Sequence, residues 1–198
     1  MARWLAPYVA DAGMVIDLGC GTGLLLDLLR VAPDHYYGID ISEGMLARAR
    51  QKHPAHRFLA GDIEAPIRGI ADGRADLVVS LFGSISYCGL EAARDRVMRL
   101  LAPGGRFFLM FCGPRYPTRS TFIDAGGGGL RPEPAARVIA AYAPERAWGM
   151  SAVVDWLPGR APNALFDGVL RLERATIGRV ARDLCYFLIV TGRRSSRV

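Results

Sequence analysis

Short apolar runs alternate with stretches of helical spacing over the first 112 residues of the chain. The apolar runs, bounded by Gly, Asp or Pro, predict strands at residues 14–18, 35–40, 56–62, 75–82 and 105–112. The stretches between them predict helices at residues 22–31, 42–52 and 90–101. Continuous apolar runs of this length are typical of strands buried on both faces of a sheet. The alternation therefore predicts an α/β fold with a doubly wound, parallel sheet.

The pattern loosens after residue 112. Residues 113–134 hold five glycines and four prolines, a composition that predicts a loop. The remaining patterns predict helices at 135–143 and 164–178 and strands at 148–156 and 182–192. No linker or repeat divides the chain. We therefore expect a single domain over residues 1–198, with 113–147 and 157–181 as insertions that cover the substrate.

Composition narrows the class of protein. The 198 residues are 51% hydrophobic and 22% charged, which excludes a disordered chain and suits one sizeable domain. No apolar run approaches the roughly 18 residues of a membrane helix. The first 13 residues hold too short an apolar core for a signal peptide, so we expect a cytoplasmic protein.

Charge and cysteine content argue against two further kinds of partner. The net charge is +6, but the arginines are spread along the chain and Lys52 is the only lysine, so nucleic-acid binding is not favoured. The four cysteines form no C-x-x-C pair and have no histidine beside them. We therefore expect buried free thiols and no metal site.

Glycines at alternate positions follow the first predicted strand in VIDLGCGTG (15–23). Glycine has no Cβ and tolerates positive φ, so a ligand can approach the backbone closely there. The spacing of Gly19, Gly21 and Gly23 is G-x-G-x-G. A dinucleotide fingerprint would need glycine at Leu24, and a P-loop would need a following G-K-[ST]. The loop thus indicates a ligand of another kind.

Carboxylates end two neighbouring predicted strands. Asp40 ends the second strand, where it can accept hydrogen bonds from both hydroxyls of a ribose. Asp62 ends the third strand, where it can accept from an adenine amino group. The carboxyl ends of parallel strands share one edge of the sheet, where ligands bind. Both acids are also compatible with ordinary turn residues.

Five segments together resemble the class I S-adenosylmethionine-dependent methyltransferases. They are VIDLGCGTG, YYGIDISEGMLARAR, AGDIEAPI, DLVVSLFGSISY and LLAPGGRFFLM, which occur in the order expected of that family. The resemblance implies a seven-stranded, mostly parallel, Rossmann-like sheet whose last strand is antiparallel. It also implies that S-adenosyl-L-methionine binds across the carboxyl edge of that sheet.

The resemblance assigns a cofactor role to particular residues. The glycine loop comprises Gly19, Cys20, Gly21 and Gly23, of which Cys20 and Gly21 would line the methionine part of the cofactor. Asp17 would orient the loop and the methionine part. Asp40 would hold the ribose, Ile41 and Met45 would pack on the adenine, and Asp62 with the backbone of Ile63 would bind the adenine edge. Leu81 would offer its carbonyl to the ammonium group. Asp17 as a helix cap, and Ile41 and Met45 as core residues, are the alternatives.

Methyl transfer from a sulfonium is an in-line displacement that depends mainly on alignment, and a general base is needed only for a protonated acceptor. The sequence identifies no certain catalytic residue. Tyr87, Tyr116 and Asp155 are candidates to orient or deprotonate the acceptor, and Arg115 to pair with an acidic one; loop packing is the alternative for each. The three histidines are expected at the opposite edge of the sheet.

A small-molecule methyltransferase is the leading interpretation of the sequence. S-L-F-G follows the fourth strand, in place of the [DN]-P-P-[YF] of enzymes that methylate nucleic-acid amino groups. An RNA or protein methyltransferase is one alternative, and a cofactor-binding scaffold of the same fold without turnover is another. A nicotinamide dehydrogenase is disfavoured by the glycine spacing and by the absence of a Tyr-x-x-x-Lys pair.

Overall fold

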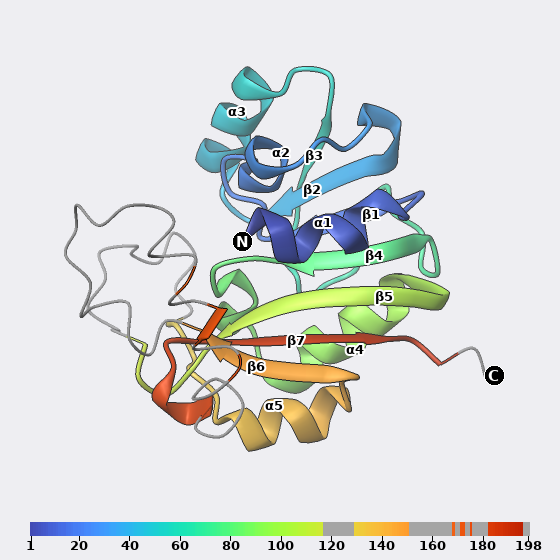
Figure 1. The fold of residues 1–198 in the computed structure, drawn as a ribbon. Coiled ribbons are helices and arrows are strands. Elements are labelled where there is room, and N and C mark those ends of the chain that lie inside the picture. Colours follow the sequence, from blue (N-terminus) through green and yellow to red (C-terminus); the bar gives the residue numbers. More distant parts are fainter. Residues whose placement is uncertain (117–128, 151–167, 169–170, 173–174, 176–181, 196–198) are drawn as a thin grey trace.

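The computed structural model describes residues 1–116, 129–150, 168, 171–172, 175 and 182–195 (Figure 1). Within them, seven strands form one sheet in the order β3-β2-β1-β4-β5-β7-β6. The strands are β1 (Val15–Leu18), β2 (Tyr36–Asp40), β3 (Arg57–Ala60), β4 (Ala75–Ser80), β5 (Leu101–Cys112), β6 (Arg146–Met150) and β7 (Phe187–Arg193). The helices are α1 (Ala2–Ala10), α2 (Leu24–Leu28), α3 (Glu43–Lys52), α4 (Leu90–Leu100) and α5 (Ala135–Tyr142), with short 3₁₀ helices η1 (Pro33–His35), η2 (Ser84–Tyr87) and η4 (Arg182–Leu184).

The sheet confirms the predicted fold class. Strands β3, β2, β1, β4 and β5 pair in parallel, and β7 pairs antiparallel with both β5 and β6. The chain winds outward from β1 to β3 and then returns to place β4 on the other side of β1. This reversal leaves a crevice at the carboxyl ends of β1 and β4, where doubly wound folds bind their ligands.

Two apolar layers cover the faces of the sheet. Leu5 of α1 and Leu46 of α3 pack with Phe108 on one face, whereas Val97 of α4 and Val138 of α5 pack with Phe107 on the other. Successive residues of β5 thus point to opposite faces, and both faces are buried. This burial explains why the strands are largely continuous apolar runs rather than an alternation of apolar and polar residues.

Several elements differ in length from the prediction. The strand predicted at 182–192 begins only at Phe187, because the chain forms the 3₁₀ helix η4 over Arg182–Leu184. Helix α2 spans five residues, because the chain is already extended at Leu29; it is extended again at Ala32, the residue before Pro33. Strand β5 starts at Leu101, directly after α4, and its pairing with β4 is irregular between Ala75 and Leu77. The helix predicted at 42–52 is confirmed as α3. Ser42 caps it and accepts a hydrogen bond from the Met45 amide at 3.4 Å.

Part of segment 113–147 belongs to the core and does not cover the cavity. Helix α5 packs against α4 and the sheet, and its Val138 and Tyr142 are buried in the same cluster as Phe107. Residues 117–128 of the first predicted insertion and most of the second, 157–181, lie outside the described residues. The covering role of both segments therefore stays a prediction. In the described part of the chain, no helix combines the length and apolarity needed to cross a bilayer.

Candidate active site

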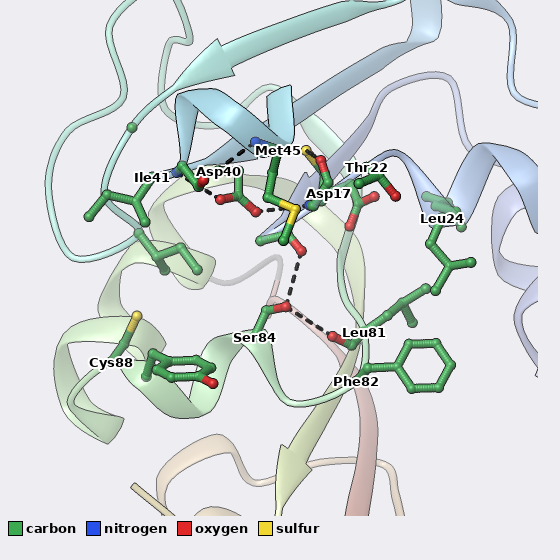
Figure 2. A pocket seen from close by; sticks show the side chains of 18 of the residues that line it. Asp17, Thr22, Leu24, Asp40, Ile41, Met45, Leu81, Phe82, Ser84 and Cys88 are labelled. Carbon is green, nitrogen blue, oxygen red and sulfur yellow. Dashed lines mark hydrogen bonds between the residues drawn. The ribbon is translucent and has the colours of Figure 1, made fainter. Parts of the chain in front are cut away.

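A cavity of about 980 Å³ opens at the carboxyl edge of the sheet, beside the crevice between β1 and β4. Loops that follow β1, β2, β3, β4 and β5 all contribute to its wall. Figure 2 labels lining residues from the loops after β1, β2 and β4. Every residue predicted to hold the cofactor lines this cavity except Gly23. Gly23 packs instead beside His53, the residue that follows α3: a Cβ on Gly23 would lie 2.8 Å from the Cδ2 atom of the His53 ring.

The glycine loop reaches the cavity through two different uses of glycine. A Cβ on Gly19 would lie 2.2 Å from the Cβ of Ser84, so the loop after β4 packs where a side chain would otherwise stand. Gly21 has a φ of +54°, and a Cβ there would meet nothing within 4 Å. Gly19 therefore permits contact inside the protein, whereas Gly21 leaves backbone open to a ligand.

Asp40 joins the glycine loop to the end of β2. Its Oδ2 accepts a hydrogen bond from the Gly21 amide at 2.8 Å, and its Oδ1 accepts one from the Ser42 amide at 2.9 Å. A carboxylate oxygen can accept two hydrogen bonds, so each retains capacity for a ligand hydroxyl. Asp40 thus fixes the loop and also faces the cavity.

Asp17 is a buried acid at the end of β1. Its Oδ2 accepts a hydrogen bond from the hydroxyl of Tyr36 at 3.0 Å. Burial raises the pKa of Asp17 from 3.8 to about 7; the Tyr36 hydrogen bond opposes this shift and the charge of Asp40 adds to it. Near neutral pH, Asp17 is therefore poised between its charged and neutral forms.

Three acids of the cavity form no ion pair with another described side chain, although Arg48 also lines the cavity. None of the ion pairs among the described residues includes Asp17, Asp40 or Asp62. Asp62 accepts a hydrogen bond from the Glu64 amide at 2.9 Å. These acids and the backbone of Gly19–Gly21 form what we call the polar end of the cavity. Their unpaired negative charge favours a ligand that carries positive charge.

Apolar side chains adjoin the polar end where an adenine was predicted. Ile41 follows Asp40 and is 60% exposed, although its side chain is large and apolar. Met45 and the buried Ile63 line the same part of the wall. An exposed apolar side chain beside acids suits a ligand that has an apolar face and polar edges.

The loop after β4 is locked to the glycine loop by Ser84. Its Oγ lies 3.0 Å from the Gly19 carbonyl oxygen and 3.1 Å from the Leu81 carbonyl oxygen, so its single proton is shared between two acceptors (Figure 2). Leu81, predicted to face the ligand's ammonium group, lines the cavity. The sequence analysis did not identify Ser84, because no spacing rule shows that these two loops meet.

Phe82 has an unusual backbone conformation in this loop. Its φ is +52°, in the left-handed region, which costs a bulky residue about 1–2 kcal/mol. The ring packs edge to face on that of Phe187, with 6.1 Å between the ring centroids. Phe187 packs in the same way on Tyr116, with 5.1 Å between the ring centroids. Phe82, Tyr116 and Phe187 form the aromatic end of the cavity. Figure 2 shows Phe82 across the cavity from the carboxylates of Asp17 and Asp40.

The predicted acceptor residues meet different outcomes. Tyr87 and Tyr116 line the cavity, whereas Arg115 is exposed and is not part of the described lining. Asp155 lies outside the described residues. Arg131, which the sequence analysis did not identify, lines the cavity beside Gly89. Their chemical roles stay predictions.

Neither the cysteines nor the histidines supply a reactive group to this cavity. Cys20 and Cys88 line it as free thiols, and burial, assisted by nearby acids, raises the pKa of both; that of Cys88 rises to about 12. Both thiols are therefore protonated at neutral pH. All three histidines are described and none belongs to the lining. The ring of His53 is hydrogen-bonded to the Asp27 carboxylate, and the ring of His56 is hydrogen-bonded to the Val31 carbonyl oxygen.

Comparison with known proteins now adds to the geometry. Residues 15–105 match a family model described as a methyltransferase domain. This range runs from β1 into β5 and contains all the loops of the polar end. It stops before Tyr116 and Phe187, so the aromatic end lies largely outside the match.

Two curated relatives have similar sequences over about half of this chain. Malonyl-[acyl-carrier protein] O-methyltransferase of Pectobacterium atrosepticum is 38% identical over 105 residues, which are 52% of this chain and 40% of that protein. Trans-aconitate 2-methyltransferase of Delftia acidovorans is 39% identical over 100 residues, which are 49% of this chain and 37% of that protein. The chain thus spans less than half the length of these relatives.

A solved structure matches nearly the whole chain. The S-adenosylmethionine dependent methyltransferase from Mesorhizobium loti superposes with a TM-score of 0.65, over 98% of this chain and 95% of that one. The two sequences are 21% identical, so this likeness is one of fold.

Proposed function

We propose that this chain is a class I S-adenosylmethionine-dependent methyltransferase that transfers the methyl group of S-adenosylmethionine to a small-molecule acceptor. S-adenosylmethionine is the cofactor of this family. The matched family model and the two curated relatives support the reaction class. The acceptor is a separate question, because the match ends before Tyr116 and Phe187 of the aromatic end.

The observation that carries the proposal is the arrangement of Asp40 and the glycine loop in one cavity. Asp40 holds the loop through the Gly21 amide and keeps acceptor capacity for two ribose hydroxyls. The open space at Gly21 suits close approach by the methionine part. Asp17 supplies a buried acid for the positive charge of that part, and Ile41 offers an apolar platform to the adenine.

The chemistry needs alignment more than acid–base catalysis. When bound, S-adenosylmethionine supplies a methyl group whose bond to sulfur breaks, with its electron pair passing to the sulfur, as the bond to the acceptor forms. The chain's contribution is to hold the methionine part on the glycine loop and to exclude water, and such alignment is worth roughly 7–11 kcal/mol. A protonated acceptor must also lose its proton, and Tyr87 and Tyr116 are the candidates in the described lining.

Two alternatives remain testable beside a small-molecule acceptor. An RNA or protein acceptor would need a docking surface, and the spread of arginines along the sequence does not favour one. A scaffold would bind the cofactor without turnover. The acceptors named for the two relatives, trans-aconitate and a malonyl group on a carrier protein, support small acyl or acid acceptors among related enzymes.

Calorimetric titration tests the proposal. Purified protein is titrated with S-adenosylmethionine, with S-adenosylhomocysteine and with NAD⁺ as the control. We expect micromolar binding of the first two and none of the third. Absence of binding by both sulfur compounds would refute the proposed function and leave the fold unaffected.

A further inference from the structure

Phe82, at the aromatic end of the cavity, has two energetically unfavourable features, its solvent exposure and its backbone conformation. Phe82 is 44% exposed, although its ring is large and apolar. It also holds a φ of +52° that glycine would adopt without strain, as the neighbouring Gly83 does at +80°. Exposure and strain at one position indicate a functional demand on that side chain.

The rings of the aromatic end form a continuous surface from three different elements. Phe82 follows β4, Tyr116 follows β5, and Phe187 begins β7. Edge-to-face contacts at 6.1 Å and 5.1 Å join them through Phe187. Phe82 and Tyr116 line the cavity together with Phe187, so a bound molecule meets more than one ring. Aromatic side chains in this arrangement favour another ring in stacked or edge-to-face contact.

Charged side chains of the described lining belong to other parts of the cavity. Glu64 and Arg131 lie beside Gly89, because Glu64 Oε1 and Arg131 Nη1 each come within 3.4 Å of the position of a Cβ there. Gly89 follows Cys88, which Figure 2 shows on the opposite side of the cavity from Phe82. The acids Asp17 and Asp40 also lie across the cavity from Phe82. Arg48, the other cation of the described lining, stands on α3 one turn after Met45, in the part of the wall assigned to the adenine. Neither Arg48 nor Arg131 thus belongs to the aromatic end, so an anionic group there would lack a cationic partner in the described lining.

We infer that the acceptor is a planar, uncharged aromatic compound whose ring packs against Phe82 and the rings beside it. This inference rests on the proposed function, because it assigns the polar end to the cofactor and the aromatic end to the acceptor. It separates this chain from the two curated relatives, whose named acceptors are acyclic acids. The sequence match with those relatives covers about half of this chain, so their acceptors are not assigned to it.

The test uses protein saturated with S-adenosylhomocysteine and measures binding of naphthol and indole by saturation-transfer difference NMR. Trans-aconitate and glucosamine serve as acyclic and non-aromatic probes. We expect the two aromatic probes to bind and to compete with each other, and trans-aconitate and glucosamine to give no signal. Binding of trans-aconitate or glucosamine in preference to the aromatic probes would overturn the inference.

Two variants make the test specific to Phe82. Phe82→Gly removes the ring and relieves the positive φ, so it should fold at least as stably as the wild type. It should bind the aromatic probes at least tenfold more weakly and retain S-adenosylhomocysteine affinity within threefold. Leu184→Ala is the matched control, since Leu184 is an exposed apolar residue outside the described lining. Equal binding of the aromatic probes by Phe82→Gly and wild type would also overturn the inference.

The two proposals fail in distinguishable ways. Wild-type protein that does not bind S-adenosylhomocysteine contradicts the proposed function, and the inference falls with it. Wild-type protein that binds S-adenosylhomocysteine but neither aromatic probe contradicts the inference alone.

Discussion

The polar end of the cavity is built from turns and acids at the carboxyl ends of parallel strands. The aromatic end is built from side chains after β4, after β5 and at the start of β7, which meet only in the fold. At the polar end, Gly21 and Asp40 act through a backbone amide and a carboxylate in fixed positions. At the aromatic end, Phe82 and Phe187 act through ring contacts. The first kind of construction leaves a pattern in the sequence, and the second does not.

The difference also has a functional meaning. A doubly wound sheet places the carboxyl ends of its parallel strands at one edge whatever the sequence of the loops. Groups such as Asp40 are therefore positioned by the sheet itself, and they suit a ligand common to a whole family. The aromatic end depends on the particular loops, and it suits a ligand specific to one member.

The largest effect is expected from Asp40→Ala. The change would remove the two charge-assisted hydrogen bonds that we propose Asp40 makes to the ribose, each worth about 1.5–3 kcal/mol, so affinity for S-adenosylmethionine should fall at least 100-fold. The loop bonds to the Gly21 and Ser42 amides are also lost. Calorimetry measures the affinity. Asp95→Ala is the control, because Asp95 is exposed on α4 and pairs with its neighbour Arg94. Unchanged affinity in Asp40→Ala would refute the ribose assignment.

The second prediction concerns pH and Asp17. Positive charge from the bound cofactor favours ionised Asp17, whose pKa in the free protein is about 7. Below pH 7 binding must release a proton, so affinity should rise with pH, by up to tenfold per unit, and level off above pH 7. Titrations from pH 5.5 to 8.5 measure this, and Asp17→Asn should flatten the profile. A flat wild-type profile would disprove the coupling.

The same pKa determines the sign of a stability effect. The folded-state pKa of Asp17 lies above its unfolded value of 3.8, so the folded protein binds the proton more tightly. The contribution of Asp17 to stability therefore falls as pH rises from about 4 to 7 and stays low above that. Asp17→Asn should raise the melting temperature at pH 8 relative to wild type, and by less at pH 5. Thermal unfolding without cofactor checks this; an equal change at both pH values would contradict it.

A smaller effect is expected where the two ends are joined. Ser84→Ala removes the hydroxyl that links the Gly19 and Leu81 carbonyls. A hydrogen bond of this kind contributes about 0.5–1.5 kcal/mol, so cofactor affinity should fall roughly twofold to tenfold. Ser84→Thr, which keeps a hydroxyl, should recover part of the loss. A full loss in both variants would indicate packing rather than the hydrogen bond as the cause.

The smallest effect is expected from the histidines, which belong to neither end of the cavity. Replacement of His35, His53 and His56 by Asn should leave cofactor affinity within threefold and turnover largely intact. Some stability should be lost, because His53 packs on Gly23 and bonds Asp27. Circular dichroism provides the control for folding. A collapse of turnover in a folded variant would place a histidine in the reaction.

Sequence reasoning was accurate where periodicity and strand ends carry the information. It identified Asp40 and Gly21, which the sheet brings to the cavity. It did not distinguish Gly23, which is absent from the described lining, from the other two glycines of the loop, which line the cavity. The same G-x-G-x-G spacing is compatible with packing against His53 and with close approach of a ligand. Phe82 and Phe187 were missed because their contact depends on the register between β5 and β7, where Cys112 lies opposite Phe187. That register follows from packing of the whole sheet and has no local signal.

The most direct test of the division into two ends is a crystal structure of the protein with S-adenosylhomocysteine. The account predicts ribose hydroxyls on the Asp40 carboxylate, the amino-acid part on Gly19–Gly21, and the sulfur facing Phe82. Adenine or ribose placed among Phe82, Tyr116 and Phe187, with Asp40 free of ligand, would contradict it.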